Sequence, residues 1–277
     1  VGEVMGFVGP NGAGKTTMLR MLSGLLRPDA GQGRVLGHDL LLSAGEIRAR
    51  VGYMPQKLAL YGELSVVENL RFRAEVYGLD RPGAAVEEML SLFSLEPYAR
   101  QRAGWLSGGW ARRLQFAATV LHRPGLILLD EPTAGLDAIA KLEVWRRVAH
   151  FAAAGASVVI NTHDLVEAEQ CGRISLFNAG RIIAEGAPGA VTGALDIAVL
   201  SVEAGPDQAA ELERLDGVVA VHPEGRRLRV VAPPAMLSRL DDEMRKLGLK
   251  AREDAVGLVD SEFALAEPLG RKAEAVR

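Results

Sequence analysis

The stretch GPNGAGKT, residues 9–16, limits what this chain can fold into more than any other part of the sequence. Its three glycines allow backbone conformations with positive φ, so the main chain can wrap closely around a ligand. The apolar run before it, residues 4–8, predicts a short buried strand, and residues 16–23 predict an amphipathic helix. A strand, a glycine-rich loop and a helix in this order are typical of a loop that binds phosphate.

The polar positions of this loop have expected roles. Backbone amides at the start of the helix, together with the positive end of its dipole, favour an anion. We expect Lys15 to reach the β- and γ-phosphates of a nucleotide and the hydroxyl of Thr16 to bind Mg2+. The predicted phosphate-binding residues are Gly9, Asn11, Gly12, Gly14, Lys15, Thr16 and Thr17.

Composition and charge exclude several classes of function. A net charge of -3 over 277 residues gives no general electrostatic reason to bind nucleic acid or an anionic membrane. No apolar stretch approaches the ~20 residues that span a bilayer, so a membrane role would come through a partner. The single cysteine, Cys171, cannot form an internal disulfide; a small half-buried apolar role and a reducing cytosol are expected. Since the chain begins at Val1, close to the phosphate loop, we expect a fragment without a signal peptide.

Apolar runs alternate with helical patterns, which predicts an α/β sheet over residues 1–190. Between them, a region with helical spacing and breaks at Gly78 and Pro97 predicts a helical subdomain at about residues 62–120. The predicted strands of this domain are 4–8, 126–129, 158–161 and 174–177, with a helix over 138–152.

After Gly193 the pattern changes to that of a small α+β domain. We expect the linker to start near 186–189, and residues 191–277 to hold the rest of the linker, this domain and a frayed tail from Glu267. The predicted strands are 197–202 and 228–231, the predicted helices are 207–215 and 236–247, and a hairpin turn is predicted at Glu224-Gly225.

The segment LILLDEP, residues 126–132, is an apolar strand that ends in two carboxylates. This is the layout of a Walker B strand. Asp130 can complete the ligand shell of Mg2+, while Glu131 is left to polarise an attacking water. A phosphate loop alone leaves a kinase, a GTPase, a helicase and a transporter open, and this strand favours nucleotide hydrolysis. An ordinary strand with an acidic turn is the alternative interpretation of the segment.

The segment LSGGWARRL, residues 106–114, predicts a second helix start that favours an anion, with Ser107 at or near the cap and Arg112 and Arg113 behind it. Two such helix starts for one nucleotide make sense if the second serves the neighbouring subunit across a two-fold axis. A plain N-capped helix is the alternative.

Three further polar residues follow strands or turns. Gln56 and His163 each come after a predicted strand, where a side chain can reach the γ-phosphate, although such residues often lie in surface loops. Asp137 follows a turn at Gly135-Leu136 and either contacts the opposite subunit or caps a helix.

The order of these segments resembles the nucleotide-binding subunit of ATP-binding cassette (ABC) transporters over about residues 1–190. The resemblance implies a P-loop NTPase fold of the ABC type. It makes Gln56 the Q-loop glutamine, residues 106–110 the signature, Asp137 the D-loop aspartate and His163 the switch histidine. By this resemblance the catalytic residues are Glu131, His163 and Gln56, the Mg2+ ligands are Thr16, Gln56 and Asp130, and the residues that complete a neighbouring site are Ser107, Gly108, Gly109 and Asp137.

The segments GLLRPDAGQGRVLGHDL and VGYMPQKLALYGELSVVENL, with LSGGW, look like ATPases of ABC-2 type exporters, including multidrug exporters. The residues VDSEF, 259–263, resemble the small C-terminal domain of such proteins. The resemblance implies an ATP-hydrolysing homodimer, closed head to tail across the nucleotide, on the cytoplasmic face of the membrane. It would drive a separate integral membrane permease, without nucleic acid.

Two departures from the family pattern are expected to matter. The leading strands and the aromatic residue that stacks on adenine are absent from this sequence, and Trp110 replaces the usual glutamine of the signature. We expect Trp110 to modify the dimer interface rather than abolish it.

A soluble ABC ATPase acting on chromosomes or ribosomes is the main alternative. The chromosome type needs a long heptad insertion and the ribosome type two cassettes, and the sequence has neither. A scaffold that no longer hydrolyses is disfavoured by Lys15, Asp130, Glu131 and His163, and a GTPase by the lack of an Asn-Lys-x-Asp motif.

Overall fold

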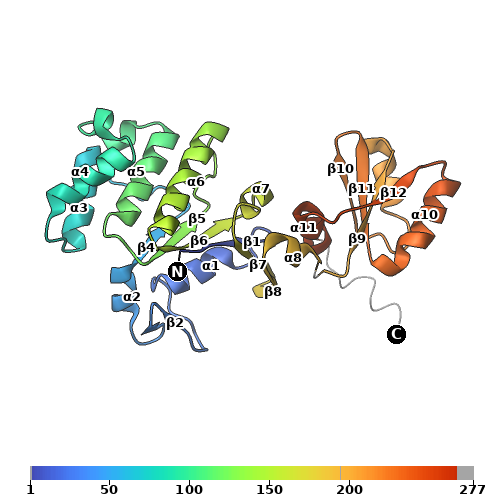
Figure 1. The fold of residues 1–277 in the computed structure, drawn as a ribbon, viewed down its shortest axis with the longest axis horizontal. Coiled ribbons are helices and arrows are strands. Elements are labelled where there is room, and N and C mark those ends of the chain that lie inside the picture. The colour runs from blue at the N-terminus through green and yellow to red at the C-terminus, as the bar shows by residue number, and fades with distance from the viewer. Residues whose placement is uncertain (1, 194, 267–277) are drawn as a thin grey trace.

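The computed structural model describes residues 2–193 and 195–266, which form two lobes (Figure 1). The larger, N-terminal lobe is built on six strands: β1 (Val4–Val8), β4 (Val51–Met54), β5 (Leu126–Asp130), β6 (Ser157–Thr162), β7 (Arg173–Asn178) and β8 (Arg181–Gly186). Their order in the sheet is β4-β5-β6-β1-β7-β8, and all neighbours pair in parallel except β7 with β8.

The four predicted strands of this lobe are confirmed to within two residues at each end. Ile127, Leu128 and Leu129 of β5 are fully buried because helices cover both faces of the sheet, which explains the continuous apolar run. The strand expected before Gln56 is β4, and β8 is the strand of this sheet that the sequence pattern did not predict. β8 is an edge strand whose Ile182 and Ile183 stay exposed, so it lacks the pattern of a buried strand.

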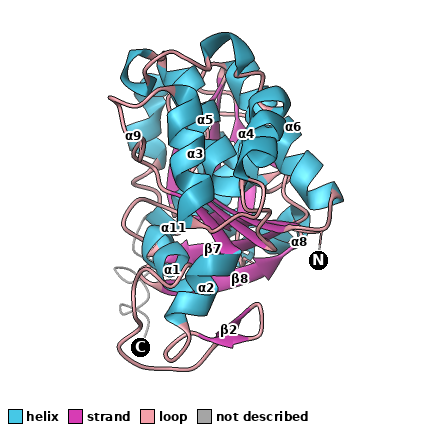
Figure 2. Cartoon of the chain, turned by 90° about the vertical axis from the view of Figure 1, so that its left-hand side faces the viewer, coloured by secondary structure: helices cyan, strands magenta, loops and turns pink. Residues whose placement is uncertain are grey.

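Helices lie on both faces of the sheet (Figure 2). On one face, Leu19 and Ile47 pack against Phe7 and Leu128. On the other face, a larger apolar cluster joins the sheet to the helical region. The helices and small strands of this lobe outside the helical region are α1 (Lys15–Leu22), β2 (Arg34–Val35), β3 (His38–Asp39), α2 (Ala44–Arg50), α6 (Ala138–Ala153), α7 (Leu165–Ala168) and α8 (Pro188–Gly193).

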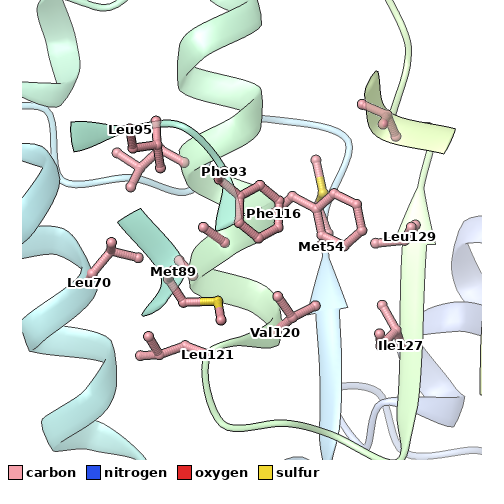
Figure 3. Packing of buried hydrophobic residues seen from close by; sticks show 14 of the residues in the cluster. Met54, Leu70, Met89, Phe93, Leu95, Phe116, Val120, Leu121, Ile127 and Leu129 are labelled. Carbon is pink, nitrogen blue, oxygen red and sulfur yellow. The ribbon is translucent and has the colours of Figure 1, made fainter. Parts of the chain in front are cut away.

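The helical region shares its core with the sheet. The rings of Phe93 and Phe116 meet edge to face, with centroids 5.4 Å apart, and lie beside Met54 and Leu129 of the sheet (Figure 3). This continuity fixes the helices relative to the strands that carry polar side chains. The elements of the region are α3 (Val66–Val76), α4 (Pro82–Leu92), η1 (Glu96–Tyr98), η2 (Ala103–Trp105) and α5 (Gly108–Val120).

The C-terminal lobe contains a four-stranded antiparallel sheet with the order β10-β11-β9-β12, made of β9 (Ala198–Val202), β10 (Ala220–Glu224), β11 (Arg227–Ala232) and β12 (Ala251–Asp254). Its connections follow a split β-α-β-β-α-β plan. The predicted turn at Glu224-Gly225 is confirmed, with Gly225 at φ 61°. The remaining elements of the lobe are η3 (Pro206–Gln208), α9 (Ala209–Leu212), η4 (Pro234–Met236), α10 (Leu237–Lys246) and α11 (Leu258–Ala266).

Two sequence predictions for this part of the chain are wrong. The helix expected over 207–215 is only η3 followed by α9, because the amides of Arg214 and Leu215 bond to carbonyls three residues back and the α-helix ends. The linker start expected at 186–189 is the junction of β8 and α8, since Pro188 suits a first helical turn and Val191 is buried against the larger lobe.

Helix α11 contacts both lobes. Its Leu258 is buried with Val8, Ile174 and Val191 of the larger lobe, while Ala264 packs on the C-terminal sheet. The domain boundary at 190 and 191 stays a prediction, and the predicted frayed tail from Glu267 lies outside the described residues. Among the helices of residues 2–193 and 195–266, none is both long and apolar enough to cross a bilayer.

Candidate functional site

Four adjacent parallel strands deliver polar side chains to one edge of the larger sheet. β4, β5, β6 and β1 are neighbours, and Gln56, Asp130, His163 and the phosphate loop lie at or just beyond their carboxyl ends. In parallel sheets these ends meet at the same edge, which is where ligands bind. A hollow of about 570 Å³ opens there, lined by Asn11, Gly12, Gly14, Lys15, Thr16, Thr17, Gln56, Glu131, Asn161 and His163.

The phosphate loop has the conformation that its glycines permit. Gly9 lies at φ 142°, where an added Cβ would be 2.2 Å from the carbonyl oxygen of Phe177, so no other residue fits. Gly14, at φ 98°, is the N-cap of α1. The side chain of Lys15 is buried and its Nζ donates to the carbonyl oxygens of Gly9 at 2.7 Å and Pro10 at 2.9 Å. The loop therefore curls around the ammonium of Lys15, which lines the hollow. A positive charge enclosed in this way favours an anion bound in the hollow.

Oxygen atoms gather beside the start of α1. The hydroxyl of Thr16 donates to Oδ1 of Asp130 at 2.9 Å. The side-chain amide of Asn161 donates through Nδ2 to both Asp130 and Thr16. The hydroxyl of Tyr53 donates to the other oxygen of Asp130 at 3.3 Å. Burial is the main reason that the pKa of Tyr53 is raised, so this phenol remains a donor at neutral pH.

This oxygen cluster fits Mg2+. Asp130 is only 1% exposed, and Oδ1 of Asn161 is a buried acceptor that has no hydrogen-bond partner among the described residues. Within the described ranges, no group of three or more His, Cys, Asp or Glu side chains forms a metal cage of its own. A Mg2+ ion here would thus need phosphate and water oxygens as well, which is its usual form of binding beside nucleotides.

Glu131 occupies a strained position at the centre of the site. Its φ of 48° lies in the left-handed region, which residues other than glycine rarely adopt. Oε2 accepts a hydrogen bond from Nε2 of Gln56 at 2.8 Å, and Oε1 lies 3.1 Å from Nδ1 of His163. The backbone amide of Glu131 donates to the carbonyl of Asn161 at 2.9 Å. Both predicted γ-phosphate residues therefore meet the same carboxylate.

Helix α5 supports the loop that carries Gln56. Arg112 Nη1 donates to the carbonyl oxygen of Gln56 at 2.8 Å, and Gln115 Nε2 donates to the carbonyls of Pro55 and Lys57. Burial lowers the pKa of Arg112, an effect that nearby Glu131 opposes. The sequence pattern predicts Arg112 behind a second anion site, whereas its guanidinium holds the loop of Gln56.

The signature residues and Asp137 lie apart from Lys15, around a second hollow. Ser107 is the exposed N-cap of α5, and its side chain makes no capping hydrogen bond. Asp137 caps α6, where its carboxylate accepts from the amide of Ala140 at 2.8 Å. The hollow measures about 420 Å³ and is lined by Ser107, Gly109, Trp110, Arg113, Gly135, Leu136, Asp137, Ile139 and Ala140.

Trp110, the unusual residue of the signature, is fixed on two sides. The ring of Tyr98 lies 4.5 Å from it between centroids, and the guanidinium of Arg113 stands 4.5 Å from its centroid. Gly108 begins α5 and is exposed like Ser107. Within one subunit, the structure thus brings together the loop, Gln56, Asp130, Glu131 and His163, and leaves the second set of residues separate.

Three residues that shape the site are not among the predicted ones: Tyr53, Asn161 and Glu167. The buried carboxylate of Glu167 accepts hydrogen bonds from the hydroxyls of Thr133 and Thr162, beside Glu131 and His163 in the chain. Tyr53 and Asn161 are polar positions near the end of apolar strands, a signal that a closer look at strand ends would have found. Glu167, by contrast, lies in the first turn of α7, where acidic residues are common for reasons of helix dipole alone.

Several known proteins are similar to this chain in sequence. A family model described as ABC transporter matches residues 1–134. The chain is 40% identical to the daunorubicin resistance ATP-binding protein DrrA3 of Streptomyces coeruleorubidus over 264 residues, 92% of this chain and 83% of that protein. It is 44% identical to the probable multidrug ABC transporter ATP-binding protein YbhF of Escherichia coli strain K12 over 191 residues. That match covers 68% of this chain and 33% of YbhF, so the chain spans about a third of the length of this relative.

A solved structure agrees with the sequence matches. The dimeric structure of a post-hydrolysis state of the ATP-binding cassette MJ0796, bound to ADP and Pi, superposes with a TM-score of 0.62 at 26% identity. The match covers 67% of this chain and 85% of that one. The predicted fold class, an ABC-type P-loop domain followed by a small C-terminal domain, is therefore confirmed. Together, the site and the relative that spans nine-tenths of this chain show that the protein belongs to the ABC transporter family, among its ATP-binding proteins.

Proposed function

We propose that this chain is the ATP-hydrolysing subunit of an ABC-2 type exporter. The observation that carries the proposal is the meeting of Lys15, Glu131 and His163 around one hollow at the ends of adjacent strands. The names of the similar proteins, which refer to multidrug transport and daunorubicin resistance, support export as the process that hydrolysis drives. The proposal assigns residues 1–190 to the ATPase domain and the rest to a C-terminal domain.

In this proposal the triphosphate lies along the loop of Gly9, Asn11, Gly12 and Gly14, with Lys15 at the β- and γ-phosphates. Thr16, Asp130 and Gln56 are the proposed ligands of Mg2+. When bound, the ion would neutralise charge that develops on the phosphate oxygens. The hydroxyl of Thr17 also lines the hollow and can donate to a phosphate oxygen.

Glu131 is the proposed general base. Its carboxylate is placed by Gln56 and His163 and can accept a proton from a water that attacks the γ-phosphate in line. His163 faces both this carboxylate and the hollow, so it can also donate toward the γ-phosphate. The left-handed backbone at Glu131 supports this role, because strained residues concentrate where a side chain must be aimed.

The second hollow supports a shared site. Ser107, Gly108 and Gly109 present exposed or partly exposed amides and a hydroxyl, and Asp137 lies beside them, yet one subunit does not bring them to its own Lys15. We propose that two copies close head to tail, so that this set completes the site of the other copy. The similar ATP-binding cassette MJ0796 was solved as a dimer, which agrees with the proposal.

The proposed permease contact lies beside the loop of Gln56. Leu58 and Tyr61 follow Gln56 in the chain and are about half exposed, and Phe72 packs edge to face against Tyr61. Exposed apolar side chains that gather in one place mark a protein interface. The chain would then sit peripherally on the cytoplasmic face of the membrane, bound to a separate integral membrane permease and without nucleic acid.

The test is phosphate release from ATP by the purified chain with Mg2+, followed by export in cells that also make the permease. We expect turnover that Lys15→Ala abolishes and that the surface control Arg252→Ala leaves intact. Loss of export in cells carrying Lys15→Ala, with the permease still present, would support transport. Normal hydrolysis by Lys15→Ala would contradict the proposed site, whereas hydrolysis without any permease-dependent transport would contradict the proposed process.

A further inference from the structure

A buried carboxylate outside the predicted site joins two of its loops. Glu167 in α7 is 2% exposed and accepts hydrogen bonds from the hydroxyls of Thr133 and Thr162, the latter at 2.9 Å. Thr133 lies two residues after Glu131, and Thr162 is the residue before His163. Glu167 thus holds the two loops that bring the proposed base and the switch histidine together.

We infer that Glu167 is a positioning residue for hydrolysis: it fixes the distance between Glu131 and His163. The inference rests on the proposed function, because it assumes that these two side chains serve the reaction. Glu167 itself does not line the hollow and does not touch either of them, so it acts through the two threonines.

The strained backbone of Glu131 explains why such support is needed. A residue with φ of 48° stays there only when its surroundings determine it from several sides. On one side its amide bonds to the carbonyl of Asn161, and on the other the loop is held two residues later by Thr133. Without Glu167, the hydroxyls of Thr133 and Thr162 would lose their common buried acceptor, and the loop could relax.

The positively charged side chain of Lys141, in α6, lies beside Glu167. Nζ of Lys141 lies 3.4 Å from Oε1 of Glu167 and 2.5 Å from Oδ2 of Asp164. Asp164 in turn caps α7 by accepting from the amide of Val166. The network therefore extends from the loops of Glu131 and His163 to the first turn of α6, and it places the Lys141 ammonium beside the buried carboxylate that accepts from both threonines.

The test measures single-turnover hydrolysis at saturating Mg2+-ATP, which separates chemistry from binding. We expect Glu167→Ala to lower the single-turnover rate about 10- to 100-fold, the usual effect of a small misplacement of a reacting group. The Kd for a non-hydrolysable ATP analogue should stay within about threefold, because the phosphate loop lies on other elements. Glu167→Gln, which keeps the size and one acceptor, should recover part of the rate.

Comparison with Glu131→Gln distinguishes positioning from general stability. If Glu167 acts through Glu131, the Glu167→Ala change should slow hydrolysis less than about twofold further in the Glu131→Gln protein. Met89→Ala, a buried change in the helical region, is the matched control and should show no such coupling. Should Glu167→Ala fail to fold, Thr133→Val removes only the hydrogen bond of Thr133 to Glu167 and should show the same coupling. Thr162→Val also removes the bond that the amide of Asp164 donates to this hydroxyl, so it serves as the second, less selective variant.

Fully additive losses for Glu167 and Glu131, or an analogue Kd weakened as much as the rate, would overturn the inference. Failure of the proposed function looks different: Glu131→Gln alone would then hydrolyse ATP at the rate of the unchanged protein. The two results are distinguished within one set of four proteins.

Discussion

Nδ1 of His163 lies 3.1 Å from Oε1 of Glu131, although 32 positions separate the two residues in the chain. The opposite oxygen of the same carboxylate accepts from Gln56, which comes from a third strand. The Glu131 carboxylate is therefore held from both sides. In its proposed role as the base, this placement would lower the barrier of the chemical step through preorganisation.

Glu131→Gln keeps the size of the side chain and removes its ability to accept a proton. General-base contributions are about 10²- to 10⁴-fold, so we expect hydrolysis to fall by that order. ATP binding should survive, because Lys15 and the loop amides are unchanged. Phosphate release and the Kd of a labelled nucleotide check the two parts. Hydrolysis at the unchanged rate would exclude Glu131 as the base.

The same variant should reveal the proposed dimer. When ATP binds without turnover, the closed state accumulates, so gel filtration with ATP and Mg2+ should show a stable dimer for Glu131→Gln. Lys15→Ala lacks the ammonium group that is proposed to bind the phosphates, so it should remain mostly monomeric under the same conditions. A monomer in both cases would argue against closure across the nucleotide.

Subunit mixing tests whether Ser107 serves the other copy. Lys15→Ala and Ser107→Arg should each be inactive alone. In an equal mixture, half of the dimers combine the two variants and contain one intact site, so about a quarter of the normal activity should return. A mixture as inactive as its components would mean that Ser107 acts within its own subunit.

Asp260 should make the C-terminal lobe sensitive to acid. The carboxylate is buried and accepts from His222 at 2.8 Å, from Arg229 at 2.8 and 2.9 Å and from the amide of Gly257 at 2.7 Å. Burial alone would raise the pKa of Asp260, but these hydrogen bonds outweigh it and lower the pKa well below its usual range. The ionised group therefore contributes stability above pH ~4, the pKa of an unfolded aspartate, and this contribution is lost as the pH falls further.

Asp260→Asn should lower the free energy of unfolding by about 3 kcal/mol at pH 7, since it leaves the buried Arg229 without its main partner. Thermal unfolding between pH 3 and pH 7 measures this. The difference between the two proteins should shrink below pH 4, where the original carboxylate becomes protonated on unfolding. Asp242→Asn, a change at an exposed position of α10, is a suitable control. An equal difference at every pH would contradict the role of ionisation.

Cys171 should be unreactive in the folded protein. Burial, with a smaller contribution from Glu167, raises the pKa of this thiol to about 12. At pH 8 only about one thiol in ten thousand is then a thiolate, which is the reactive form. Labelling by a disulfide reagent should be about a thousandfold slower than in the unfolded chain. Rapid labelling of the folded protein would show that this region opens.

Several features of this protein follow from short stretches of sequence. The phosphate loop was predicted because three glycines, a strand and a helix are all local features, and Gly9 and Gly14 take the positive φ that the pattern requires. The carboxylate pair at Asp130 and Glu131 was found for the same reason, as it ends an apolar run. The predicted roles of the site residues stay predictions until the variants above are measured.

Other features depend on contacts between distant parts of the chain. Thr16 and Asp130 are 114 positions apart, and Asn161 joins them only because β1, β5 and β6 lie in adjacent positions of one sheet. Arg112 turned toward the loop of Gln56 rather than toward an anion for a similar reason: α5 packs against β4.

The sequence by itself determined the chemistry of the loop and the kind of fold, because backbone freedom and hydrophobic period act within a few residues. Only the tertiary structure decided that Gln56 and His163 both contact the carboxylate of Glu131. It also decided that Glu167 is buried between the loops that carry Glu131 and His163. A hydrogen-bond partner is chosen by the packing of whole elements, and α7 shows no local pattern that marks its acidic residue as buried rather than exposed.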